Sequence, residues 1–558
     1  MMKYALSTSL YAALICCTTL FSLAQTPPQN AVPYTIQFEL VTGTNAQNLP
    51  ALQSYCIAAY DDQNWFILGG RWRKDPTVPS GLHVFFPAKF DNFPSPDAVL
   101  WQINPQTQTA VQLLDLSTLP AEFGDPLSST NQQCEYDSAS DSWYIAGGYG
   151  YSQKLNRFTT FPTLIRISVS ALVKIANGNS PNKSQAIAGL INQPDNIATN
   201  ELFQVTGGAL RKTPLSGMWA LVFGQCFDGM YSPLFSGGFN QMYTNQVRYF
   251  SLKPGTVTVV GPGVLPSSDE KTYPYHRRDL PIVYDLDPAT GNDRIAAFGG
   301  VFPPGKIAGY TNPVYVTARN NQLVANVDTA GSEKFSQYEA PNIVVYDGST
   351  TYHTVFGGIG HYYYWQTPDQ KTVYEAVTNQ GRNDGLPFVA DVTTFLERSN
   401  GTYEEYIAPD PVPQNALHGA SIEFVPTESL NDKFTGMMKN VVNLKSFQPG
   451  ERELIGYIYG GVEANFPLPC ITSTGTQATN ALYRVYLTAT PWSGLIPASS
   501  GHEANPLKLY NHESEPKKKL KFAGTNPCVS AKPQAPIPPA KPYSAAQYCQ
   551  QPYDPNKQ

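Results

Sequence analysis

Residues 65–70 read Trp-Phe-Ile-Leu-Gly-Gly, a short aromatic and aliphatic run that ends in a glycine pair. A run of this length bounded by glycines predicts a buried β-strand followed by a tight turn. Further copies read WYIAGG at 143–148, RIAAFGG at 294–300, YHTVFGG at 352–358 and IGYIYGG at 455–461, and a degenerate copy reads WALVFGQ at 219–225. Because self-similarity of this kind is typical of repeat proteins, we expect six copies of one structural unit.

Further predicted strands lie before and after each glycine-ended run. Four copies follow a Tyr-Asp pair, which lies where a hairpin turn would join a first strand to the glycine-ended second strand. These pairs are Tyr60-Asp61, Tyr136-Asp137, Tyr284-Asp285 and Tyr346-Asp347. In the first copy two more strands are predicted at 99–103 and 111–114, with a turn signal between them at 104–109. Each unit is therefore expected to have four strands, and the glycines mark a close approach that leaves no room for a Cβ atom.

Four-stranded units whose apolar runs end in Gly-Gly resemble the kelch repeat, whose units form the blades of a β-propeller. The resemblance covers about residues 34–490 and implies an all-β, six-bladed kelch-like β-propeller. The last copy supplies 481–490 as a third strand and no clear fourth strand. We expect segment 34–41 to be that missing strand, which would close the ring and leave no open sheet edge.

The spacing of the copies predicts insertions. The first glycines, taken at 69, 147, 224, 299, 357 and 460, lie farther apart than the ~50 residues of a kelch unit. One insertion is predicted at 182–196, with a helix over 183–192, and another at 429–450 inside the last unit.

Composition narrows the class of protein. The 558 residues include 43 glycines, 48 prolines and 34 tyrosines, and only 14% of the residues are charged. Such a chain has too many aromatic residues to be disordered and too little helix-forming pattern for a helical bundle. The net charge of −6 lacks the positive field that non-specific nucleic-acid binding needs, so we expect no nucleic-acid partner.

The start of the chain reads as an export signal. Lys3 precedes an apolar stretch at 11–23, and Ser22 and Ala24 offer small residues for cleavage, so residues 1–24 are predicted to be a signal peptide. An uncleaved anchor is the alternative. No later stretch reaches ~18 consecutive apolar residues, so no further membrane-spanning segment is expected. The protein is predicted to be secreted or periplasmic, or associated with the cell surface.

The rest of the chain divides into two parts. Residues 25–495 are expected to form the propeller, and residues 496–558 form a low-complexity tail rich in Pro, Lys and Gln. A basic run at 517–521 lies in this tail and reads as a solvated segment.

Eight cysteines become six once the signal is removed, and an even number in an oxidising compartment permits disulfides. Cys56 and Cys134 occupy similar places in the first strands of adjacent units, so we predict that they are bonded. Cys528 and Cys549 are candidates to close a loop in the tail. No CxxC or clustered Cys/His spacing occurs, so no metal site is predicted.

The kelch resemblance also implies where a ligand would bind. In such propellers the loops after the glycine pairs and the loops that enter each first strand gather on one face around the axis. Arginines and aromatic rings on that face suit a polar, planar or anionic ligand, such as an acidic sugar or a peptide carboxylate. The candidate ligand-binding residues are Tyr55, Arg71, Trp72, Arg73, Tyr149, Tyr151, His276, Arg277, Arg278, His361, Tyr363 and His418.

Structural interpretations of the same residues stay open. Residues 71–74 also read as a solvated loop, and 361–365 as a strand packed in a core. His418 matches a position where kelch repeats often carry a histidine that makes structural hydrogen bonds.

The predicted function is a non-catalytic binding module for a protein or glycan, with no cofactor; the oligomeric state stays open. The alternative is a carbohydrate-active enzyme that resembles the sialic acid mutarotases or the galactose oxidase family. Tyr275-His276 and Tyr352-His353 reproduce a Tyr-His dipeptide of the copper site in galactose oxidase. Nucleophile-elbow, zinc-protease and phosphate-loop motifs are absent from the sequence. A third interpretation is a structural surface protein that assembles through the tail.

Overall fold

The computed structural model describes residues 32–42, 45, 48–72, 98–231, 239–253, 255–266, 273–304, 308–366, 371–375, 386–408, 411–412, 417–420, 422–464, 476–490 and 496–497. For 72, 362–366, 371–375, 419–420 and 496–497 only the backbone is described. The predicted signal peptide, Arg73, Cys528 and Cys549 lie outside the described residues, as does almost all of the predicted tail.

Six four-stranded antiparallel units follow one another along the chain, which confirms the all-β class. The first is β3 (Cys56–Asp61), β4 (Asn64–Leu68), β6 (Val99–Asn104) and β7 (Thr109–Asp115). The second is β8 (Gln133–Asp137), β9 (Ser142–Ala146), β12 (Thr163–Ile167) and β13 (Ile197–Thr199). The third is β14 (Ala209–Lys212), β15 (Met218–Val222), β18 (Gln246–Leu252) and β19 (Val259–Pro266).

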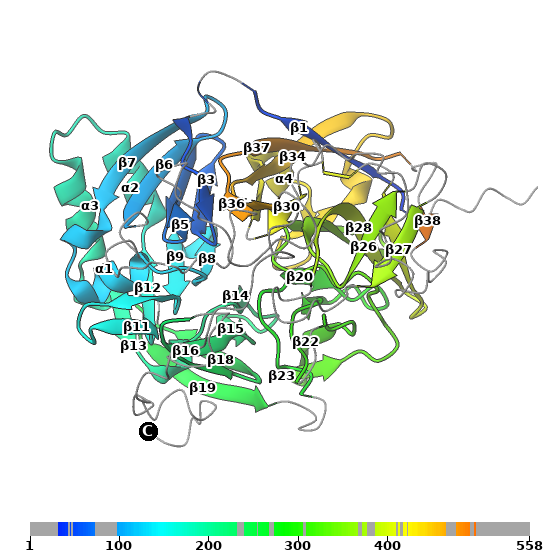
Figure 1. The fold of residues 1–558 in the computed structure, drawn as a ribbon, viewed down its shortest axis with the longest axis horizontal. Helices are drawn as coiled ribbons and strands as arrows, with labels where there is room; N and C mark the ends of the chain where they lie inside the picture. Colours follow the sequence, from blue (N-terminus) through cyan, green and yellow to red (C-terminus); the bar gives the residue numbers. More distant parts are fainter. Residues whose placement is uncertain are drawn as a thin grey trace, which may run out of the picture.

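The fourth unit is β20 (Ile282–Leu286), β21 (Asp293–Ala297), β22 (Val314–Arg319) and β23 (Gln322–Val327). The fifth is β24 (Asn342–Tyr346), β25 (Thr350–Ile359), β28 (Phe388–Arg398) and β29 (Tyr403–Ile407), and β38 (Ile496–Pro497) pairs with β29. The sixth is β31 (Glu423–Pro426), β34 (Arg452–Tyr459), β37 (Leu482–Thr488) and the N-terminal β1 (Thr35–Leu40). Figure 1 shows these sheets around a common centre in chain order, the architecture of a β-propeller.

The glycine-ended runs form the second strand of each unit. The glycines follow that strand in the other units with an intact pair, whereas in the fifth unit Gly357 and Gly358 lie within β25, where the register shifts. Both glycines of the five intact pairs have positive φ, for example 66° at Gly147 and 90° at Gly148. A Cβ atom on Gly147 would lie 2.0 Å from the carbonyl oxygen of Val205, which belongs to the segment entering the next unit. This confirms the predicted reason for the glycines, a close approach of two backbones.

In the degenerate copy the two positive-φ positions lie one residue earlier than expected from the sequence. In the third unit Phe223 (φ 56°) and Gly224 (φ 87°) make the turn after β15, so Gly224 is the second residue of the pair and not the first. Phe223 is fully buried and stacks on Tyr275 with ring centroids 5.0 Å apart. This packing holds a bulky residue in a left-handed conformation that favours glycine.

The second residue of the pair also links neighbouring units through its N–H group. The bonds run from Gly70 to Ser129 O (2.8 Å), Gly148 to Val205 O (2.9 Å), Gly224 to Arg277 O (3.0 Å) and Gly461 to Leu52 O (2.7 Å). The repeat motif therefore supplies both the turn and a hydrogen bond to the next unit.

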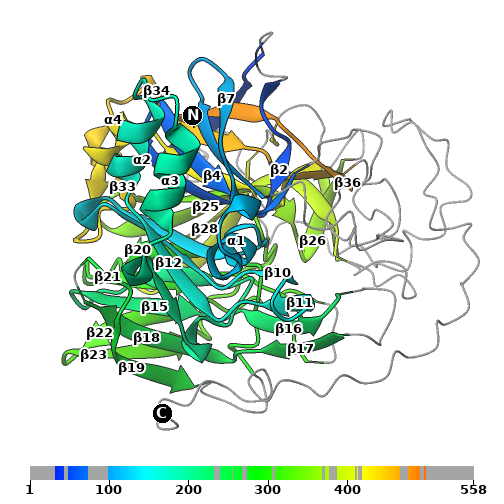
Figure 2. The ribbon, with the colours of Figure 1, turned by 90° about the vertical axis from the view of Figure 1, so that its left-hand side faces the viewer.

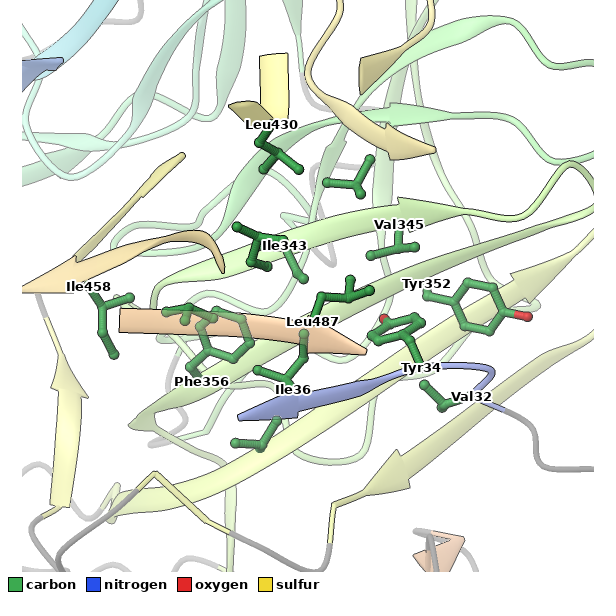
Figure 3. Close-up of a cluster of buried hydrophobic side chains, with 14 of the residues drawn as sticks. Val32, Tyr34, Ile36, Ile343, Val345, Tyr352, Phe356, Leu430, Ile458 and Leu487 are labelled. Carbon is green, nitrogen blue, oxygen red and sulfur yellow. The ribbon is translucent and has the colours of Figure 1, made fainter. Parts of the chain in front are cut away.

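The N-terminal strand β1 lies on the outer side of β37, with Thr35 opposite Thr488 and Leu40 opposite Tyr483. Just before and within it, Val32, Tyr34 and Ile36 pack into a core cluster between the fifth and sixth units (Figure 3). The Tyr34 hydroxyl lies 2.6 Å from Thr354 Oγ1. Burial of each large apolar side chain of this kind contributes about 1.5–3 kcal/mol to stability.

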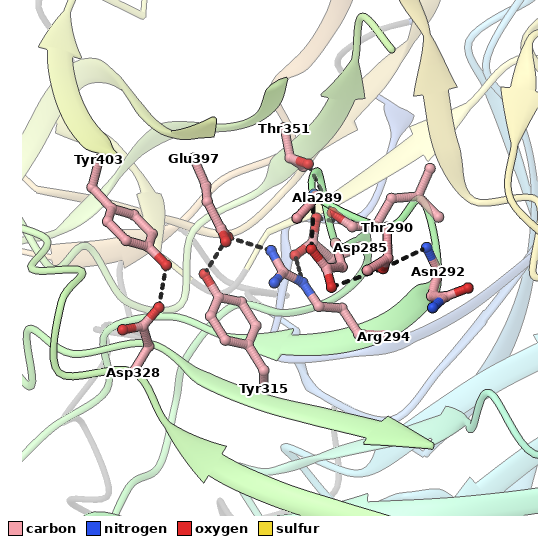
Figure 4. A network of polar contacts seen from close by, with 12 residues as sticks. Asp285, Ala289, Thr290, Asn292, Arg294, Tyr315, Asp328, Thr351, Glu397 and Tyr403 are labelled. Atoms are coloured by element: carbon pink, nitrogen blue, oxygen red, sulfur yellow. Dashed lines mark hydrogen bonds and ion pairs between the residues drawn. The ribbon is translucent and has the colours of Figure 1, made fainter. Parts of the chain in front are cut away.

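Charged side chains join the fourth and fifth units (Figure 4). The guanidinium of Arg294 on β21 donates to Asp285 on β20 (2.6 Å) and to Glu397 on β28. Tyr315 donates to the same Glu397 carboxylate (3.0 Å). Both Asp285 and Arg294 are buried, so this network is a structural bridge between units.

Both predicted insertions are present. The first carries α3 (Lys183–Ile191), close to the helix predicted over 183–192, and a further helix, α2 (Val169–Ala176), precedes the predicted insertion. The second carries α4 (Glu428–Asn431), β32 (Phe434–Thr435) and β33 (Val441–Asn443), and β33 pairs in parallel with β24 of the fifth unit. The predicted disulfide joins Cys56 on β3 to Cys134 on β8, with their Cα atoms 5.9 Å apart.

The loops after the glycine pairs, together with segments that enter the first strands, build small additional sheets. Strands β10 (Tyr149–Ser152), β11 (Arg157–Thr160), β16 (Gln225–Gly229) and β17 (Phe239–Tyr243) form one sheet, and β30 (Leu417–Ala420), β35 (Val462–Ala464) and β36 (Thr476–Ala478) form another. Two hairpin-like pairs are β2 (Leu52–Gln53) with β5 (Arg71–Trp72), and β26 (Tyr362–Gln366) with β27 (Lys371–Glu375). Figure 2 shows β10, β11, β16, β17, β26 and β36 on one side of the molecule, near which α1 (Ala121–Leu127) also lies.

Within the described part of the chain, no helix combines the length and the apolar character needed to cross a membrane.

Candidate functional site

A pocket opens on the face that carries these small sheets, with about 630 Å³ of free space that includes its open mouth. Five of the six units contribute residues to the wall of the pocket. These residues lie in the segment that enters the first strand of a unit or in the loop that follows its second strand. The lining residues are Ser54, Arg71, Thr130, Asn131, Tyr149, Thr206, Gln225, Phe227, Tyr231, Arg278, Asp279, Tyr338 and Glu339. The lining combines aromatic rings with hydroxyl, amide and charged groups, the kinds of group that orient a bound ligand.

A chain of backbone hydrogen bonds between units holds this lining in place. Five residues, two or three positions before the first strands, have positive φ: Ser54 (53°), Asn131 (52°), Gly207 (66°), Asp279 (53°) and Glu339 (51°). From Asn131 onward, the N–H group of each of these residues donates a hydrogen bond to the carbonyl oxygen of the residue named before it. The donor–acceptor distances are 3.1 Å for Asn131, 3.4 Å for Gly207, 2.7 Å for Asp279 and 3.1 Å for Glu339. We call this series the axial ring. Four of its five members are not glycine, and strained backbone of this kind is concentrated at functional sites.

Two arginines line the pocket from the first and fourth units. Arg71 on β5 is buried, and its Nη2 donates to Gln53 Oε1 at 3.1 Å. Arg278 donates from Nε to the Tyr243 hydroxyl (3.0 Å) and from Nη1 to the Asp279 carboxylate. These partners fix the orientation of the Arg278 guanidinium beside the pocket.

Aromatic rings form one wall of the pocket. Tyr149 and Phe227 lie 5.2 Å apart, and Phe227 lies 5.2 Å from Tyr231. The Tyr149 hydroxyl donates to Gly229 O (2.9 Å) and accepts from the Tyr231 N–H (2.8 Å). Burial raises the pKa of Tyr149 above its ordinary value of 10, so this phenol stays neutral and serves as a fixed hydrogen-bonding group.

Of the predicted ligand-binding residues, the structure brings Arg71, Tyr149 and Arg278 together in this pocket. Trp72 and Tyr363 lie on β5 and β26, where only the backbone is described, and Arg73 lies outside the described residues.

Three other candidates are buried, have structural partners and are not among the lining residues. Tyr55 donates its hydroxyl to Tyr459 O (2.7 Å). Arg277 donates to the carbonyl oxygens of Pro274 (2.7 Å), Gly299 (2.9 Å) and Asn312 (2.7 Å) and is only 1% exposed. His418 is also buried, with Nε2 3.6 Å from Glu463, as in the structural interpretation of this histidine.

The remaining three candidates are placed near the pocket face but not among its lining residues. The Tyr151 hydroxyl donates to Asn156, and His361 Nδ1 accepts from the Gly309 N–H at 3.3 Å. His276 stacks on Tyr243 with ring centroids 3.6 Å apart, and burial together with the charge of Arg278 lowers the pKa of His276 to about 4. His276 is therefore neutral at physiological pH and supports the tyrosine that holds Arg278.

Most of the uncharged residues that line the pocket were not predicted from the sequence. Ser54, Thr130, Asn131 and Thr206 carry no motif of their own, and Asp279 and Glu339 were not selected. Their common feature is a position two or three residues before a first strand, so aligning the units on those strands would identify them.

The residues implied for a galactose oxidase-like copper site do not fit one. The Tyr275 hydroxyl donates to Ala325 O (2.9 Å), and its ring is buried against Phe223. His353 is buried within β25 and stacks on Phe298, with ring centroids 4.0 Å apart. Among the described residues, no group of three or more His, Cys, Asp or Glu side chains is placed to hold a metal ion.

No family model and no curated protein matches this chain. Among solved structures, "Structure of YjhT" is 11% identical, covers 77% of this chain and 98% of its own, and has a TM-score of 0.37. A fungal alcohol oxidase of the AA5 family in complex with copper is 12% identical (81% and 93% covered, TM-score 0.30), and the Dos1 propeller is 9% identical (78% and 93%, 0.30). At these scores the likeness carries no argument, so the propeller assignment rests on the sheets themselves.

Proposed function

We propose that this protein is an exported, six-bladed, kelch-type propeller that binds a protein or glycan ligand in the axial pocket without chemical turnover. The observation that carries the proposal is the construction of the pocket: five units each place a lining residue around one opening, next to the axial ring. Residues so far apart in sequence converge at one position because of the propeller architecture, and loops on a rigid scaffold are where binding residues are concentrated.

Two contacts support a ring of six blades closed between its ends. Strand β1 has the fourth-strand position beside β37, and the Gly461 N–H of the sixth unit donates to Leu52 O, just before the first. A closed ring keeps the loops of the first unit, including Arg71, fixed relative to those of the fourth.

The lining favours a ligand that combines a ring with an anionic group. Arg71 and Arg278 supply cations for a carboxylate, Tyr231 and Tyr338 supply aromatic surface, and the surrounding hydroxyl and amide groups suit hydroxyls of a sugar or the backbone of a peptide. An acidic sugar or a peptide carboxylate meets these requirements.

A screen of glycans and peptides against the purified protein tests the proposal. Arg278→Ala removes a lining cation, and we expect it to weaken every hit about tenfold or more, because a charge-assisted hydrogen bond is lost. Arg319→Ala is the control, because Arg319 is an exposed arginine at the end of β22 and does not line the pocket. If Arg278→Ala and the wild type bind every hit equally well, the pocket is not the binding site.

A carbohydrate-active enzyme at the same pocket is the second candidate, favoured by the two carboxyl groups of Asp279 and Glu339 in the lining. Paired carboxyl groups are the usual acid and base of sugar chemistry. Incubating each glycan hit with the protein and analysing the products separates the two functions. Turnover that is lost in Asp279→Asn and Glu339→Gln would favour the enzyme, and an unchanged glycan favours the binding module.

A further inference from the structure

Strand β17 (Phe239–Tyr243) is an edge strand of the small sheet beside the pocket (Figure 2). The order of that sheet is β10, β11, β16 and β17, so β16 covers one side of β17. Within the described part of the chain no strand pairs with the other side, which we call the outer edge of β17. Gln225 and Phe227 on β16 line the pocket, so the outer edge lies one strand away from the pocket wall.

The pairing with β16 determines which backbone groups reach the outer edge. The Thr244 N–H donates to Gly224 O at 2.9 Å, and in an antiparallel pair the bonded residues alternate with unbonded ones. The even-numbered residues of β17 therefore bond to β16, and the odd-numbered residues direct their N–H and C=O groups to the outer edge. In agreement, Gln225, which lies opposite Tyr243, exchanges both of its backbone hydrogen bonds with Thr206. The residues that face the outer edge are Phe239, Gln241 and Tyr243.

The outer edge of β17 lacks the features that usually prevent the addition of a strand. Exposed edges are commonly blunted by proline, by charged side chains, by a bulge or by another element that covers them. The sequence of β17 has no proline and no charged residue, its register with β16 is unbroken, and Asn240 and Gln241 are exposed. By contrast, β19 carries Pro262, and β38 already pairs with β29. The backbone groups at the outer edge are therefore able to bond a further strand.

The side chains at the outer edge define the kind of strand that would fit. Side chains of alternate residues share one face of a sheet, so the three outward-facing residues present theirs on the same face. The centroid of the Phe239 ring lies 5.2 Å from that of Tyr231 and 5.9 Å from that of Phe227, two residues that line the pocket. A strand added beside Phe239 and Tyr243 would place alternate side chains against these rings, where apolar and aromatic residues form favourable cross-strand pairs.

The last residue of β17 leads to the pocket. The Tyr243 hydroxyl accepts a hydrogen bond from Arg278 Nε (3.0 Å), and the Tyr243 ring stacks on His276 with ring centroids 3.6 Å apart. Both partners belong to the segment that enters the fourth unit. The Nη2 atom of Arg278 makes no hydrogen bond within the described residues, so it is available to a peptide carbonyl oxygen. A chain that follows the outer edge as far as Tyr243 therefore arrives at the pocket.

We propose that the outer edge of β17 is the docking site for an extended, uncharged segment of a protein partner, which adds a fifth strand to this sheet and leads into the axial pocket. The proposal rests on the proposed function, from which it takes the protein nature of the ligand, and it adds the mode of recognition. In strand addition, main-chain hydrogen bonds supply the affinity and alternate side chains supply the specificity. The six outward N–H and C=O groups of β17 meet the first requirement, and its aromatic rings meet the second.

A library of random heptapeptides displayed on phage, selected against the purified full chain, tests the proposal. The strongest selected sequence is synthesised as the probe, and its affinity is measured after N-methylation of each backbone nitrogen in turn. An added strand bonds to β17 through alternate residues only. We therefore expect N-methylation to weaken binding about tenfold or more at every second residue and less than about twofold at the residues between them.

A pair of variants at one position tests the protein side. Gln241→Pro and Gln241→Ala both lose the side-chain hydrogen bond to Gln225, but only proline also removes the outward N–H group. We expect Gln241→Pro to bind the probe about tenfold or more weakly than Gln241→Ala. Thermal unfolding reports whether the proline variant is folded. If it is not, the N-methylation series decides the question, because that series uses the wild-type protein.

Arg278→Ala separates this proposal from the proposed function. If Arg278→Ala weakens the probe while Gln241→Pro and the N-methylation series show no effect at the edge, the pocket binds the ligand and strand docking is overturned. The reverse pattern would support strand docking and contradict binding in the axial pocket. A library that yields no binder, or N-methylation effects without a two-residue period, would overturn the proposal. So would a dimer of this chain in light scattering that Gln241→Pro abolishes, because the edge would then belong to a second copy.

Discussion

The backbone N–H of Asp279 donates to the carbonyl oxygen of Gly207 at 2.7 Å, and so joins the fourth unit to the third beside the axis. Both residues have a left-handed backbone conformation, at φ 53° and 66°. The next link of the axial ring is the Glu339 N–H, which donates to Asp279 O at 3.1 Å. Asp279 is thus both a link of the ring and a lining residue of the pocket, so scaffold and candidate site share the same backbone.

The turn glycines allow a sharp test of the close approach between units. Gly147→Ala places a Cβ atom 2.0 Å from Val205 O at a position where φ is +66°. We expect a loss of about 3 kcal/mol or more in the free energy of unfolding, from overpacking and backbone strain together. Urea unfolding measures it.

The control for that substitution is Gly189→Ala. Gly189 lies inside α3, and a Cβ atom there meets nothing within 4 Å. Alanine should stabilise this helix by about 0.5–1 kcal/mol. A Gly147→Ala protein as stable as the Gly189→Ala protein would show that the two backbones do not approach as closely as described.

Adjacent arginines are expected to behave in opposite ways. Arg277→Met leaves two buried carbonyl oxygens and one partly buried carbonyl oxygen without their donor, and it should lower the stability by about 3 kcal/mol. Arg278→Met removes a pocket residue with fewer structural partners and should cost less. Thermal unfolding of the two variants compares them directly, and equal losses would contradict the different roles assigned to the two side chains.

The Arg294 bridge predicts a pH-dependent loss of stability. Arg294→Met leaves Asp285 and Glu397 as partly or fully buried carboxylates without their cation, a change that costs about 3–5 kcal/mol. Burial raises the pKa of Asp285 to about 6 even with Arg294 present, and without the arginine this pKa should rise further. The stability loss should therefore be smaller near pH 5 than near pH 8, because protonation removes the unpaired charge.

Arg398→Met is the matched control for the bridge. Its ion pair with Glu404 is accessible to solvent, with the two side chains 32% and 42% exposed. Such pairs contribute about 0–1 kcal/mol. A loss of stability in Arg398→Met as large as that in Arg294→Met would show that burial does not distinguish the two arginines.

The disulfide between Cys56 and Cys134 closes a loop of 78 residues between the first strands of the first two units. On the chain-entropy model its removal in Cys56→Ser/Cys134→Ser lowers stability by about 4 kcal/mol. Urea unfolding with and without a reductant measures this contribution. Reductant should shift the wild-type midpoint and leave the double variant unchanged; an unaffected wild type would count against a stabilising bond.

The repeat made most of the scaffold predictable. Runs ending in glycine pairs identify the second strands, because the turn after them requires positive φ and excludes a Cβ atom. The same reasoning was wrong at Phe223, because tertiary packing against Tyr275 holds an aromatic residue where five other units have glycine. Local sequence could not reveal that compensation, which comes from a residue more than 50 positions away.

The candidate site was predictable only in part. Arg71 and Tyr149 follow glycine pairs and were found from that position. Asp279 and Glu339 were missed because hydrogen bonds between units, not a motif, bring them to the pocket. Arg277 and Arg278 read alike in the sequence, and only burial and partners separate the structural arginine from the lining one.

The most direct test of the central claim is a hydrogen-exchange footprint of the strongest ligand from the screen. We predict protection at 129–131, 206–207, 278–279 and 338–339, segments from four units that meet at the axial pocket. Protection confined to the opposite ends of the inner strands, at 61–64, 137–142 and 286–293, would contradict the account.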